Sequence, residues 1–286
     1  MSFSKISHSL DETGLEIAYD DDEDKLKAGL GLESFPLINQ ALENNGLQYW
    51  EMSPSERVAL IFLLEYLKPK VAIEIGTRHG GSLQVISHFS GRVYSLDIDP
   101  EVPARLKGQF HNVEYLIGPS RQTLPPLLQI LQRDHADVGF VLVDGDHSSD
   151  GVRNDIDNIL QFRPTSPLYI VMHDSFNPGC RLGLRQAKWA ANPFVHAVEL
   201  DFVAGLVQPT PAFRNQLWGG LAMAILLPYE RRGRFEITAR AELTVQGLTA
   251  PGRRTLQNAW AWLCAGLSWR FKKFSHLLSR WQMLER

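Results

Sequence analysis

The chain has 286 residues, of which 44% are hydrophobic and 21% charged. This composition is typical of a globular protein that buries a full core and excludes disordered and fibrous classes. At this length we expect one elaborated domain or two modest ones. The net charge of −3 gives no sign of a nucleic-acid partner, because such proteins carry a basic domain.

Cysteine usage and the apolar runs bear on the compartment. The two cysteines, Cys180 and Cys264, are too few for a disulfide framework and have no neighbour at zinc-ligand spacing, which favours a reducing compartment. The first residues lack the apolar stretch of a signal peptide, and no run approaches the roughly 18 apolar residues of a membrane span. We expect a cytoplasmic protein with no integral membrane segment.

The first expected elements are an acidic arm and a helix. Residues 1–25 hold eight acidic side chains against two lysines, a net charge of −6, and such charge runs form solvated arms. Ser53 as N-cap, Pro54 at the first helical position and apolar residues at helical spacing then predict a helix that ends near Leu67.

After Pro69 the sequence alternates between short apolar runs and stretches long enough for helices. Strands are expected at 71–75, 92–96, 113–117, 138–143 and 168–172, an order typical of a mainly parallel sheet covered on both faces. Two further runs, 195–202 and 221–227, have no evident helix between them and predict an antiparallel last pair. The predicted fold is α/β, a Rossmann-like, doubly wound sheet of seven strands with helical N- and C-terminal extensions.

The end of the chain reverses the charge of its beginning. From position 231 onward, eleven Lys and Arg face three Glu, a net charge of +8. Apolar residues from Leu256 to Leu284 recur every three or four positions, which predicts a long amphipathic helix. Packing on its own domain, a seam between subunits and a membrane-surface role stay open for this helix. We expect a homo-oligomer through it.

A glycine-rich turn joins the first expected strand to the next helix. Gly76, Gly80 and Gly81 let the backbone turn tightly and a ligand approach, and the helix that opens at Ser82 presents free N–H donors. Glu74, two residues before Gly76, would oppose a dinucleotide pyrophosphate but suit a cationic ligand with an amino group and a sulfonium, which argues against NAD. An ordinary turn of an open sheet is the alternative.

Asp97 ends the second expected strand, twenty-one residues after Gly76. An acidic side chain at this place binds two ribose hydroxyls in the dinucleotide folds. A solvated strand end is the alternative reading.

Polar clusters follow the fourth and fifth expected strands: Asp144, Asp146 and His147 after one, His173 and Asp174 after the other. Ligands bind at this edge of an open α/β sheet, and so many acids in one crevice would repel one another unless a cation or a cationic ligand neutralised them. Mg²⁺ fits, while Mn²⁺ or Fe²⁺ stay open because histidine is a less usual magnesium ligand. In the alternative, Asp144 and His147 cap the next helix and the later pair shapes a turn.

Taken in order, these motifs resemble class I S-adenosylmethionine-dependent methyltransferases, in particular the branch of macrocin O-methyltransferases and cephalosporin-hydroxylase-like proteins. The resemblance covers roughly residues 60–227 and rests on EIGTRHGGS at 74–82, SLDID at 95–99, DGDHS at 144–148 and HD at 173–174. It implies that Asp97 holds the cofactor ribose and that Ser120 lines the adenosine pocket. The residues implied to surround the methionine part of the cofactor are Glu74, Gly76, Thr77, Gly80, Gly81 and Ser82.

The same resemblance implies a catalytic centre. Asp144, His173 and Asp174 match positions that bind a divalent metal in metal-dependent members, although catechol-type enzymes carry a carboxylate where His173 stands. His147 matches the position of a general base, and its imidazole suits that task. Asp144 would also serve catalysis, since a metal that it holds with Asp174 lowers the pKa of the hydroxyl to be methylated.

The expected activity is S-adenosylmethionine-dependent, divalent-metal-assisted O-methyl transfer to a hydroxyl of a small molecule such as a sugar, a glycosylated compound or a polyphenol. Residues 48–50 and the loop 208–220 would select the acceptor. Two alternatives stay open: a metal-dependent hydroxylase-like protein on the same fold, and a non-catalytic cofactor-binding scaffold. We expect an N-terminal arm and connecting segment at 1–55, a methyltransferase core at 56–230 and a basic extension at 231–286.

Overall fold

The computed structural model describes residues 49–207, 217–243 and 245. The acidic arm, the loop 208–216, Cys264 and the helix expected from Leu256 lie outside the described residues, so these expectations stay predictions. Within the described part of the chain, no helix combines the length and apolar character needed to cross a bilayer.

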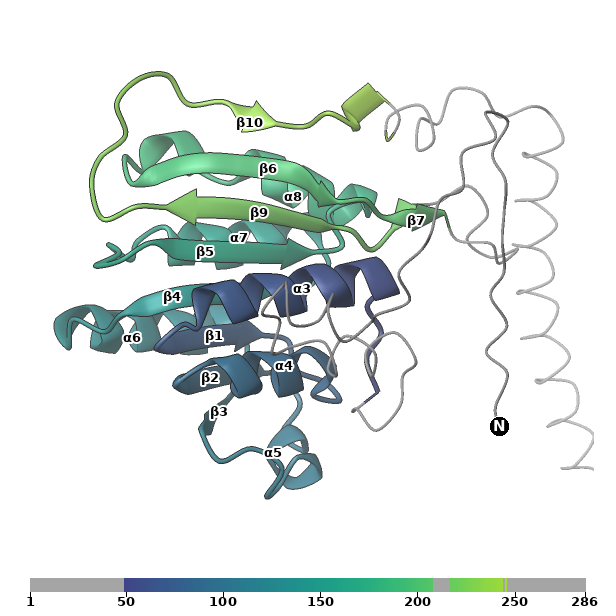
Figure 1. Ribbon diagram of the computed structural model, residues 1–286, viewed down its shortest axis with the longest axis vertical. Coiled ribbons are helices and arrows are strands. Elements are labelled where there is room, and N and C mark those ends of the chain that lie inside the picture. The colour runs from purple at the N-terminus through teal and green to yellow at the C-terminus, as the bar shows by residue number, and fades with distance from the viewer. Residues whose placement is uncertain (1–48, 208–216, 244, 246–286) are drawn as a thin grey trace, which may run out of the picture.

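The helices cover a single large sheet (Figure 1). The helical elements are α3 (Pro54–Leu67), α4 (Gly81–Phe89), α5 (Val102–Arg105), α6 (Ser120–Arg133), α7 (Ser149–Ile159), α8 (Pro178–Gln186) and η1 (Trp189–Ala191). The strands are β1 (Val71–Ile75), β2 (Arg92–Asp97), β3 (Val113–Ile117), β4 (Val138–Val143), β5 (Leu168–His173), β6 (Val195–Val203), β7 (Leu206–Val207), β8 (Leu217–Trp218), β9 (Leu221–Leu226) and β10 (Ile237–Thr238).

The sheet confirms the predicted α/β class and all seven expected strands. Its order is β10-β6-β9-β5-β4-β1-β2-β3, with β9 antiparallel to both β5 and β6 and the other neighbours parallel. Two details go beyond the prediction. β9, the last of the seven expected strands, inserts between β5 and β6, and the two-residue β10 adds an eighth strand beside β6.

Successive side chains of each strand point to opposite faces of the sheet, so an apolar core forms on each face. In β1, Ile73 and Ile75 pack with apolar residues of α6, α7 and α8, whereas Ala72 packs with residues of α3 and α4. Figure 1 shows α3 and α4 on one face and α6 and α7 on the other. Burial of both faces explains why the central strands read as continuous apolar runs.

The first helix begins as its sequence predicts. Ser53 caps α3, Pro54 occupies the first turn, and the side chains of Ser53 and Glu56 each accept the backbone N–H of the other. Such a reciprocal pair satisfies two of the N–H groups that a helix start leaves without partners.

The strand ends create a switch point at β1. From β1 the chain passes to β2 on one side, and β4 later pairs with β1 on the other. The register places Ile75 beside Leu96 and Val143, and Val143 beside Met172, so the carboxyl ends of β1, β2, β4 and β5 lie level. Open α/β sheets bind ligands at such a point.

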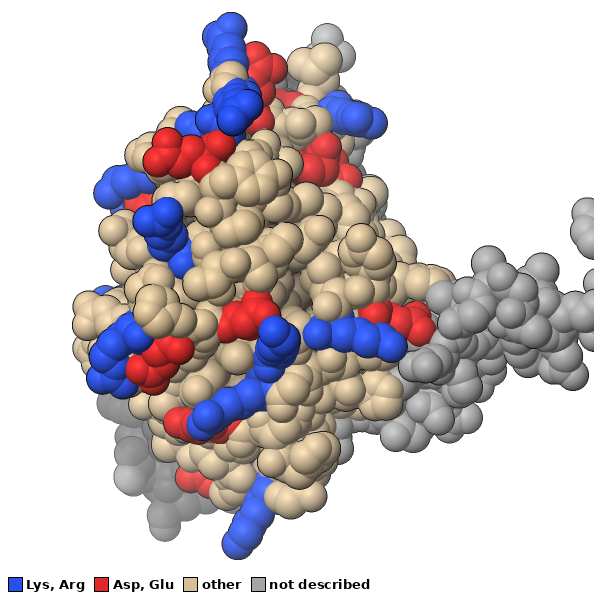
Figure 2. Space-filling model, turned by 60° about the vertical axis from the view of Figure 1, so that its left-hand side comes forward, with Lys and Arg blue, Asp and Glu red and all other residues tan. Residues whose placement is uncertain are grey.

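The opposite edge of the sheet carries paired surface charges. Lys70, just before β1, lies 2.8 Å from the Asp137 carboxylate, and the Arg133 guanidinium lies 2.8 Å from Asp134. Figure 2 shows acidic and basic side chains interspersed on the face turned forward there. Exposed pairs of this kind contribute at most about 1 kcal/mol each, so they serve surface charge balance more than stability.

We expect Gly76→Ala to destabilise the fold severely. Gly76 has φ +90°, and a Cβ there would lie 2.1 Å from the Asp144 carbonyl oxygen, so both the dihedral and the contact forbid a side chain. Gly108→Ala is the matched control, since Gly108 has φ +76° but nothing within 4 Å of its Cβ position. The control should lose about 1–2 kcal/mol of unfolding free energy in urea. Equal losses in the two variants would contradict the steric argument.

Candidate functional site

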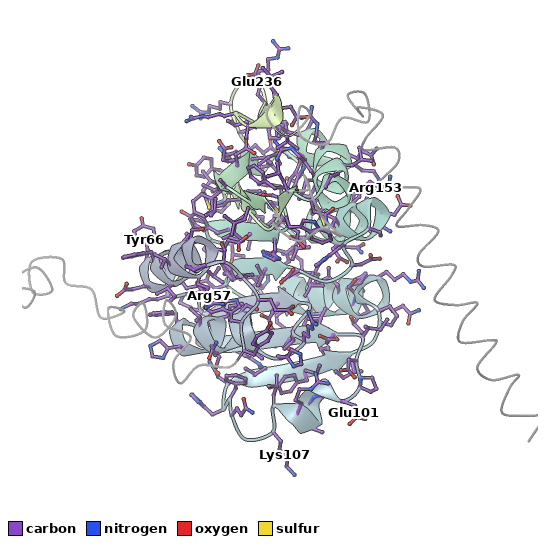
Figure 3. All side chains as sticks on the ribbon, turned by 90° about the vertical axis from the view of Figure 1, so that its right-hand side faces the viewer. Arg57, Tyr66, Glu101, Lys107, Arg153 and Glu236 are labelled. Atoms are coloured by element: carbon purple, nitrogen blue, oxygen red, sulfur yellow. The ribbon has the colours of Figure 1, made fainter. Side chains whose placement is uncertain are left out.

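A cavity of about 1270 Å³ opens at the level carboxyl ends of the strands. Its wall combines the turn after β1, the loops after β2 to β5, residues 49–54 and the β7–β8 pair. Figure 3 looks onto this edge, with Arg57 on the α3 side of the sheet and Arg153 on the α7 side. Most of the residues expected to form the site line this cavity: Gly76, Thr77, Gly81, Ser82, Asp97, Ser120, Asp144, His147, His173 and Asp174.

Glu74 lies beneath the turn rather than on the cavity wall. Its fully buried carboxylate accepts hydrogen bonds from Thr77 Oγ1 at 2.9 Å and Ser82 Oγ at 2.5 Å. Burial raises the pKa of Glu74 to about 8, although the two hydroxyls act in the opposite sense. Glu74 therefore holds the turn as a largely neutral acid, which removes the charge-based argument against a pyrophosphate.

The other glycines give the turn its close contacts. Gly80 caps α4 with φ +77° and, unlike its neighbours, does not line the cavity. A Cβ on Gly81 would lie 2.7 Å from the Cα of Trp50, so this glycine lets the segment 49–53 pass directly over the helix start. Arg57 fastens the same segment, because its guanidinium donates to the carbonyl oxygens of Trp50 and Met52.

Asp97 is rigidly held at the end of β2. Its Oδ2 accepts the backbone N–H groups of Thr77 and Arg78, each at 2.8 Å, and its Oδ1 accepts the N–H of Asp99 at 2.8 Å. Three of the roughly four lone-pair sites of this carboxylate are thus used, which leaves one site on Oδ1. Through that site Asp97 can accept a hydrogen bond from a hydroxyl of a ligand.

Two histidines and two aspartates meet after β4 and β5. The His147 ring lies between the carboxylates, with Nε2 3.2 Å from Asp144 Oδ1 and Nδ1 3.1 Å from Asp174 Oδ2. His173 Nδ1 lies 2.9 Å from Asp144 Oδ1 and 3.9 Å from Asp174 Oδ2. The expected cluster is thus assembled, and Asp146 lines the same cavity, where its Oδ1 accepts the N–H of Ser148.

The capping alternative does not account for this cluster. Ser148 caps α7, so neither Asp144 nor His147 does. Asp174 does shape a turn: its φ is +56°, and its Oδ1 accepts the N–H of Gly219 at 2.6 Å while Oδ2 faces His147. One carboxylate therefore fixes the backbone before β9 and also contacts the cavity imidazole.

Charge compensation governs the protonation of the cluster. Hydrogen bonding to Asp144 raises the pKa of His147. Burial alone would lower the pKa of His173, but Asp144 and Glu56 beside it raise that pKa well above the usual value. Burial alone would raise the pKa of Asp144, and the two imidazoles more than offset it. The carboxylates beside the two imidazoles thus favour the protonated form of each ring, and the imidazoles favour the ionised form of Asp144.

Glu56 is a site residue that sequence reasoning missed. It is 2% exposed, its Oε1 lies 3.4 Å from His173 Nε2, and it accepts the backbone N–H of Gly220. In the sequence Glu56 stands out only as the partner of Ser53 in the helix cap. No local pattern could reveal contacts with residues more than one hundred positions away.

The predicted metal ligands lie close to one another. His173 Nδ1 lies within 3.9 Å of one oxygen of both Asp144 and Asp174, and Glu56 faces its other nitrogen. A carboxylate on the second ring nitrogen is the usual partner of a metal-bound histidine. A divalent cation and the proton on His173 Nδ1 would be alternative occupants of the same place.

A second set of ligand atoms converges nearby. The atoms of His147, Asp174 and Cys180 all lie within 4.8 Å of one another. Burial raises the pKa of the Cys180 thiol to about 12, and a protonated thiol is a poor ligand. A cation that prefers oxygen ligands, such as Mg²⁺, would therefore be bound better by Asp144, His173 and Asp174 than by the group that contains Cys180.

Comparison with known proteins agrees with this geometry. Residues 73–175 match a family described as a methyltransferase domain. Over this segment the chain is similar to that family of methyltransferase domains. The match spans the glycine turn, Asp97, Ser120 and the His/Asp cluster, and it confirms the resemblance at the level of this domain. No curated protein matches the chain in sequence.

Solved structures include similar folds. One is the O-methyltransferase from Bacillus cereus in complex with SAH, which is 17% identical and covers 71% of this chain and 96% of that one, with a TM-score of 0.47. Another is the O-methyltransferase TomG from Streptomyces achromogenes in complex with SAM, also 17% identical, covering 72% and 95% of the two chains with a TM-score of 0.47.

We expect the stability of the protein to fall as pH rises, because of Glu74. Its pKa is about 8 when folded and 4.5 as a free side chain, so between these values the folded state holds a proton that the unfolded state has lost. Unfolding free energy should then decrease by as much as about 1.4 kcal/mol per pH unit across this window. Glu74→Gln should flatten the curve.

Urea denaturation at about pH 5 and about pH 8 measures this effect. The exposed Glu101, replaced by Gln, is the control that should leave the wild-type slope intact. A wild-type slope in Glu74→Gln would show that Glu74 ionises normally beneath the turn.

Proposed function

We propose that this protein transfers the methyl group of S-adenosylmethionine to a hydroxyl oxygen of a small molecule. The observation that carries the proposal is the meeting, in one cavity, of the Asp97 carboxylate, the glycine turn and the His147–Asp144–Asp174 cluster. The methyltransferase domain match supports it. So do the similar folds, whose descriptions name O-methyltransferases bound to SAH or SAM.

The order of the strands suggests how the cofactor would lie. Asp97 would bind the ribose, and the N–H groups at the start of α4, from Gly81 and Ser82, would face the carboxylate of the methionine part. The base would then extend toward the β3 side, where Ser120 lines the cavity. The sulfonium would lie near Asp144, whose negative charge favours a cation.

The chemistry assigned to the chain is positioning and proton removal. A hydroxyl oxygen attacks the methyl carbon in line with the C–S bond, and the bonding pair returns to sulfur, which leaves as the neutral thioether. In its neutral form His147 accepts the hydroxyl proton at one ring nitrogen, while the carboxylate of Asp144 or Asp174 holds the ring through the other nitrogen. Holding both reactants in this geometry supplies most of the rate.

The same carboxylates would hold a divalent cation. Asp144, His173 and Asp174 are the proposed ligands, with Mg²⁺ favoured by the oxygen donors and Mn²⁺ or Fe²⁺ compatible with the imidazole. When bound, such a cation supplies Lewis acidity that lowers the pKa of a coordinated hydroxyl. Glu56 orients His173 from the far side of the ring.

An apolar and aromatic wall points to the class of acceptor. Tyr49 is 60% and Leu206 55% exposed, and both line the cavity together with Trp50 and Trp218. Such walls bind flat or ring-shaped organic molecules, with a few polar groups to orient them. A polyphenol or a glycosylated natural product is therefore the proposed acceptor.

Methyl-labelled S-adenosylmethionine tests the reaction. Incubated with a panel of phenols, flavonoids and sugars, the protein should move the label into an acceptor hydroxyl. An oxidised product without label would favour the hydroxylase-like alternative. Tight cofactor binding with no labelled product across the panel would favour a binding scaffold.

We expect His147→Gln to lower kcat by about 10²- to 10⁴-fold, because glutamine cannot accept the proton. The dissociation constant of S-adenosylhomocysteine should change little, since the assigned role concerns the acceptor. His111→Gln, at an exposed position outside the cavity, is the matched control. Unchanged kcat in His147→Gln would exclude this residue as the base.

Chelation tests the metal. Excess EDTA should reduce methyl transfer at least tenfold, by the loss of an activated hydroxyl, and added Mg²⁺ or Mn²⁺ should restore it. Binding of S-adenosylhomocysteine, measured by calorimetry, should survive chelation. Full activity in excess chelator would remove the metal from the mechanism and leave His147 and the two aspartates to act without it.

A further inference from the structure

Cys180 is a buried thiol that the proposed chemistry does not use. It lies in the first turn of α8, and its Sγ donates a hydrogen bond to the backbone carbonyl oxygen of His147 at 3.4 Å. Ligand atoms of His147, Asp174 and Cys180 converge at this place, because one ring nitrogen, one carboxylate oxygen and the sulfur all lie within 4.8 Å of one another. The thiol thus adds a third kind of donor atom beside the imidazole and the carboxylate.

The His147 ring is oriented as a metal ligand would be. Its Nδ1 lies 3.1 Å from Asp174 Oδ2, while its Nε2 lies 3.2 Å from Asp144 Oδ1. A metal-bound histidine usually donates its other ring N–H to a carboxylate, which fixes both the tautomer and the position of the ring. With the Nε2 proton donated to Asp144, Nδ1 presents a lone pair on the side of Asp174.

The three donor atoms select a class of ion. Imidazole nitrogen, thiolate sulfur and carboxylate oxygen are the ligands of zinc, and three protein ligands with one open position are typical of its reactive sites. Sulfur favours thiophilic transition ions over Mg²⁺, which takes oxygen ligands. The cavity gives access, because His147 lines it with 45% of its side chain exposed, whereas Asp174 and Cys180 are buried behind it.

We propose that His147, Asp174 and Cys180 form a binding site for a thiophilic divalent ion such as Zn²⁺, and that the bound ion inhibits methyl transfer. The ion gains one bond to each ligand atom, and the thiol proton passes to solvent, since a coordinating thiol is deprotonated. The ion takes the lone pair of Nδ1 while Asp144 keeps the proton of Nε2, so neither nitrogen of His147 can accept a proton from an acceptor. This inhibition rests on the proposed function, whereas the metal site does not.

Co²⁺ tests the site, because it takes the same ligands as Zn²⁺ and gives an absorption signal. Titration of the full-length protein with Co²⁺ should produce a thiolate-to-cobalt charge-transfer band in the ultraviolet. Excess Zn²⁺ should abolish this band by displacement, and an equal amount of Mg²⁺ should leave it in place, since Mg²⁺ does not compete for sulfur. Absence of the band in the wild-type protein would overturn the site.

Matched variants identify the ligands. Cys180→Ser should remove the band and weaken Zn²⁺ binding, measured by calorimetry, at least about tenfold. Cys264→Ser, the control at the only other cysteine of the chain, should keep both, and so should His173→Gln, which removes a proposed Mg²⁺ ligand. A band that persists in Cys180→Ser or disappears in Cys264→Ser would overturn the assignment. Should Cys180→Ser fail to fold, a band in both wild type and Cys264→Ser assigns the sulfur to Cys180.

Inhibition is measured separately. Zn²⁺ should lower methyl transfer by the wild-type protein at least about tenfold in the presence of Mg²⁺, because the base is lost. Cys180→Ser should resist the Zn²⁺ concentration that inhibits the wild type. Cobalt binding without zinc inhibition would overturn the inhibitory role and leave the site intact. Cobalt binding by a protein that transfers no methyl group would overturn the proposed function and still support the site.

Discussion

The site depends on the close approach of the turn after β1 and the loop after β4 at the centre of the sheet. Gly76 N–H donates to Leu96 O and Asp144 N–H donates to Ile75 O, each at 2.8 Å, so the turn after β1 is bonded to both neighbouring strands. The Asp144 carbonyl occupies the space that a side chain at position 76 would need. This contact brings the glycine-rich turn and the His/Asp cluster to the wall of the same cavity.

Charge balance is the second constraint on the site. Glu56, Asp144 and Asp174 surround His147 and His173, and each imidazole contacts two of these carboxylates within 3.4 Å. The acids would repel one another without these partners. Three carboxylates therefore share two imidazoles at the same part of the cavity wall.

The sequence predicted those parts of the structure that local pattern determines. Apolar runs marked all seven long strands, and the Ser53–Pro54 start marked α3. The insertion of β9 between β5 and β6 was not predictable, since an antiparallel pair fits the sheet edge in either order. Glu56 was missed for a different reason: it reads as an ordinary polar residue of a helix, and only packing brings it to Gly220.

Asp174 illustrates how backbone and chemistry can restrict one position together. Its left-handed conformation is one that aspartate, asparagine and glycine tolerate and that branched side chains avoid. Its two carboxylate oxygens make different contacts: one accepts the N–H of Gly219, and the other faces the His147 ring. The backbone conformation and the two side-chain contacts thus each restrict which residues can occupy position 174. Most substitutions of Asp174 would disturb the loop conformation as well as the contact with His147. Evolution of a different activity in this cavity would therefore have to begin with substitutions at other residues.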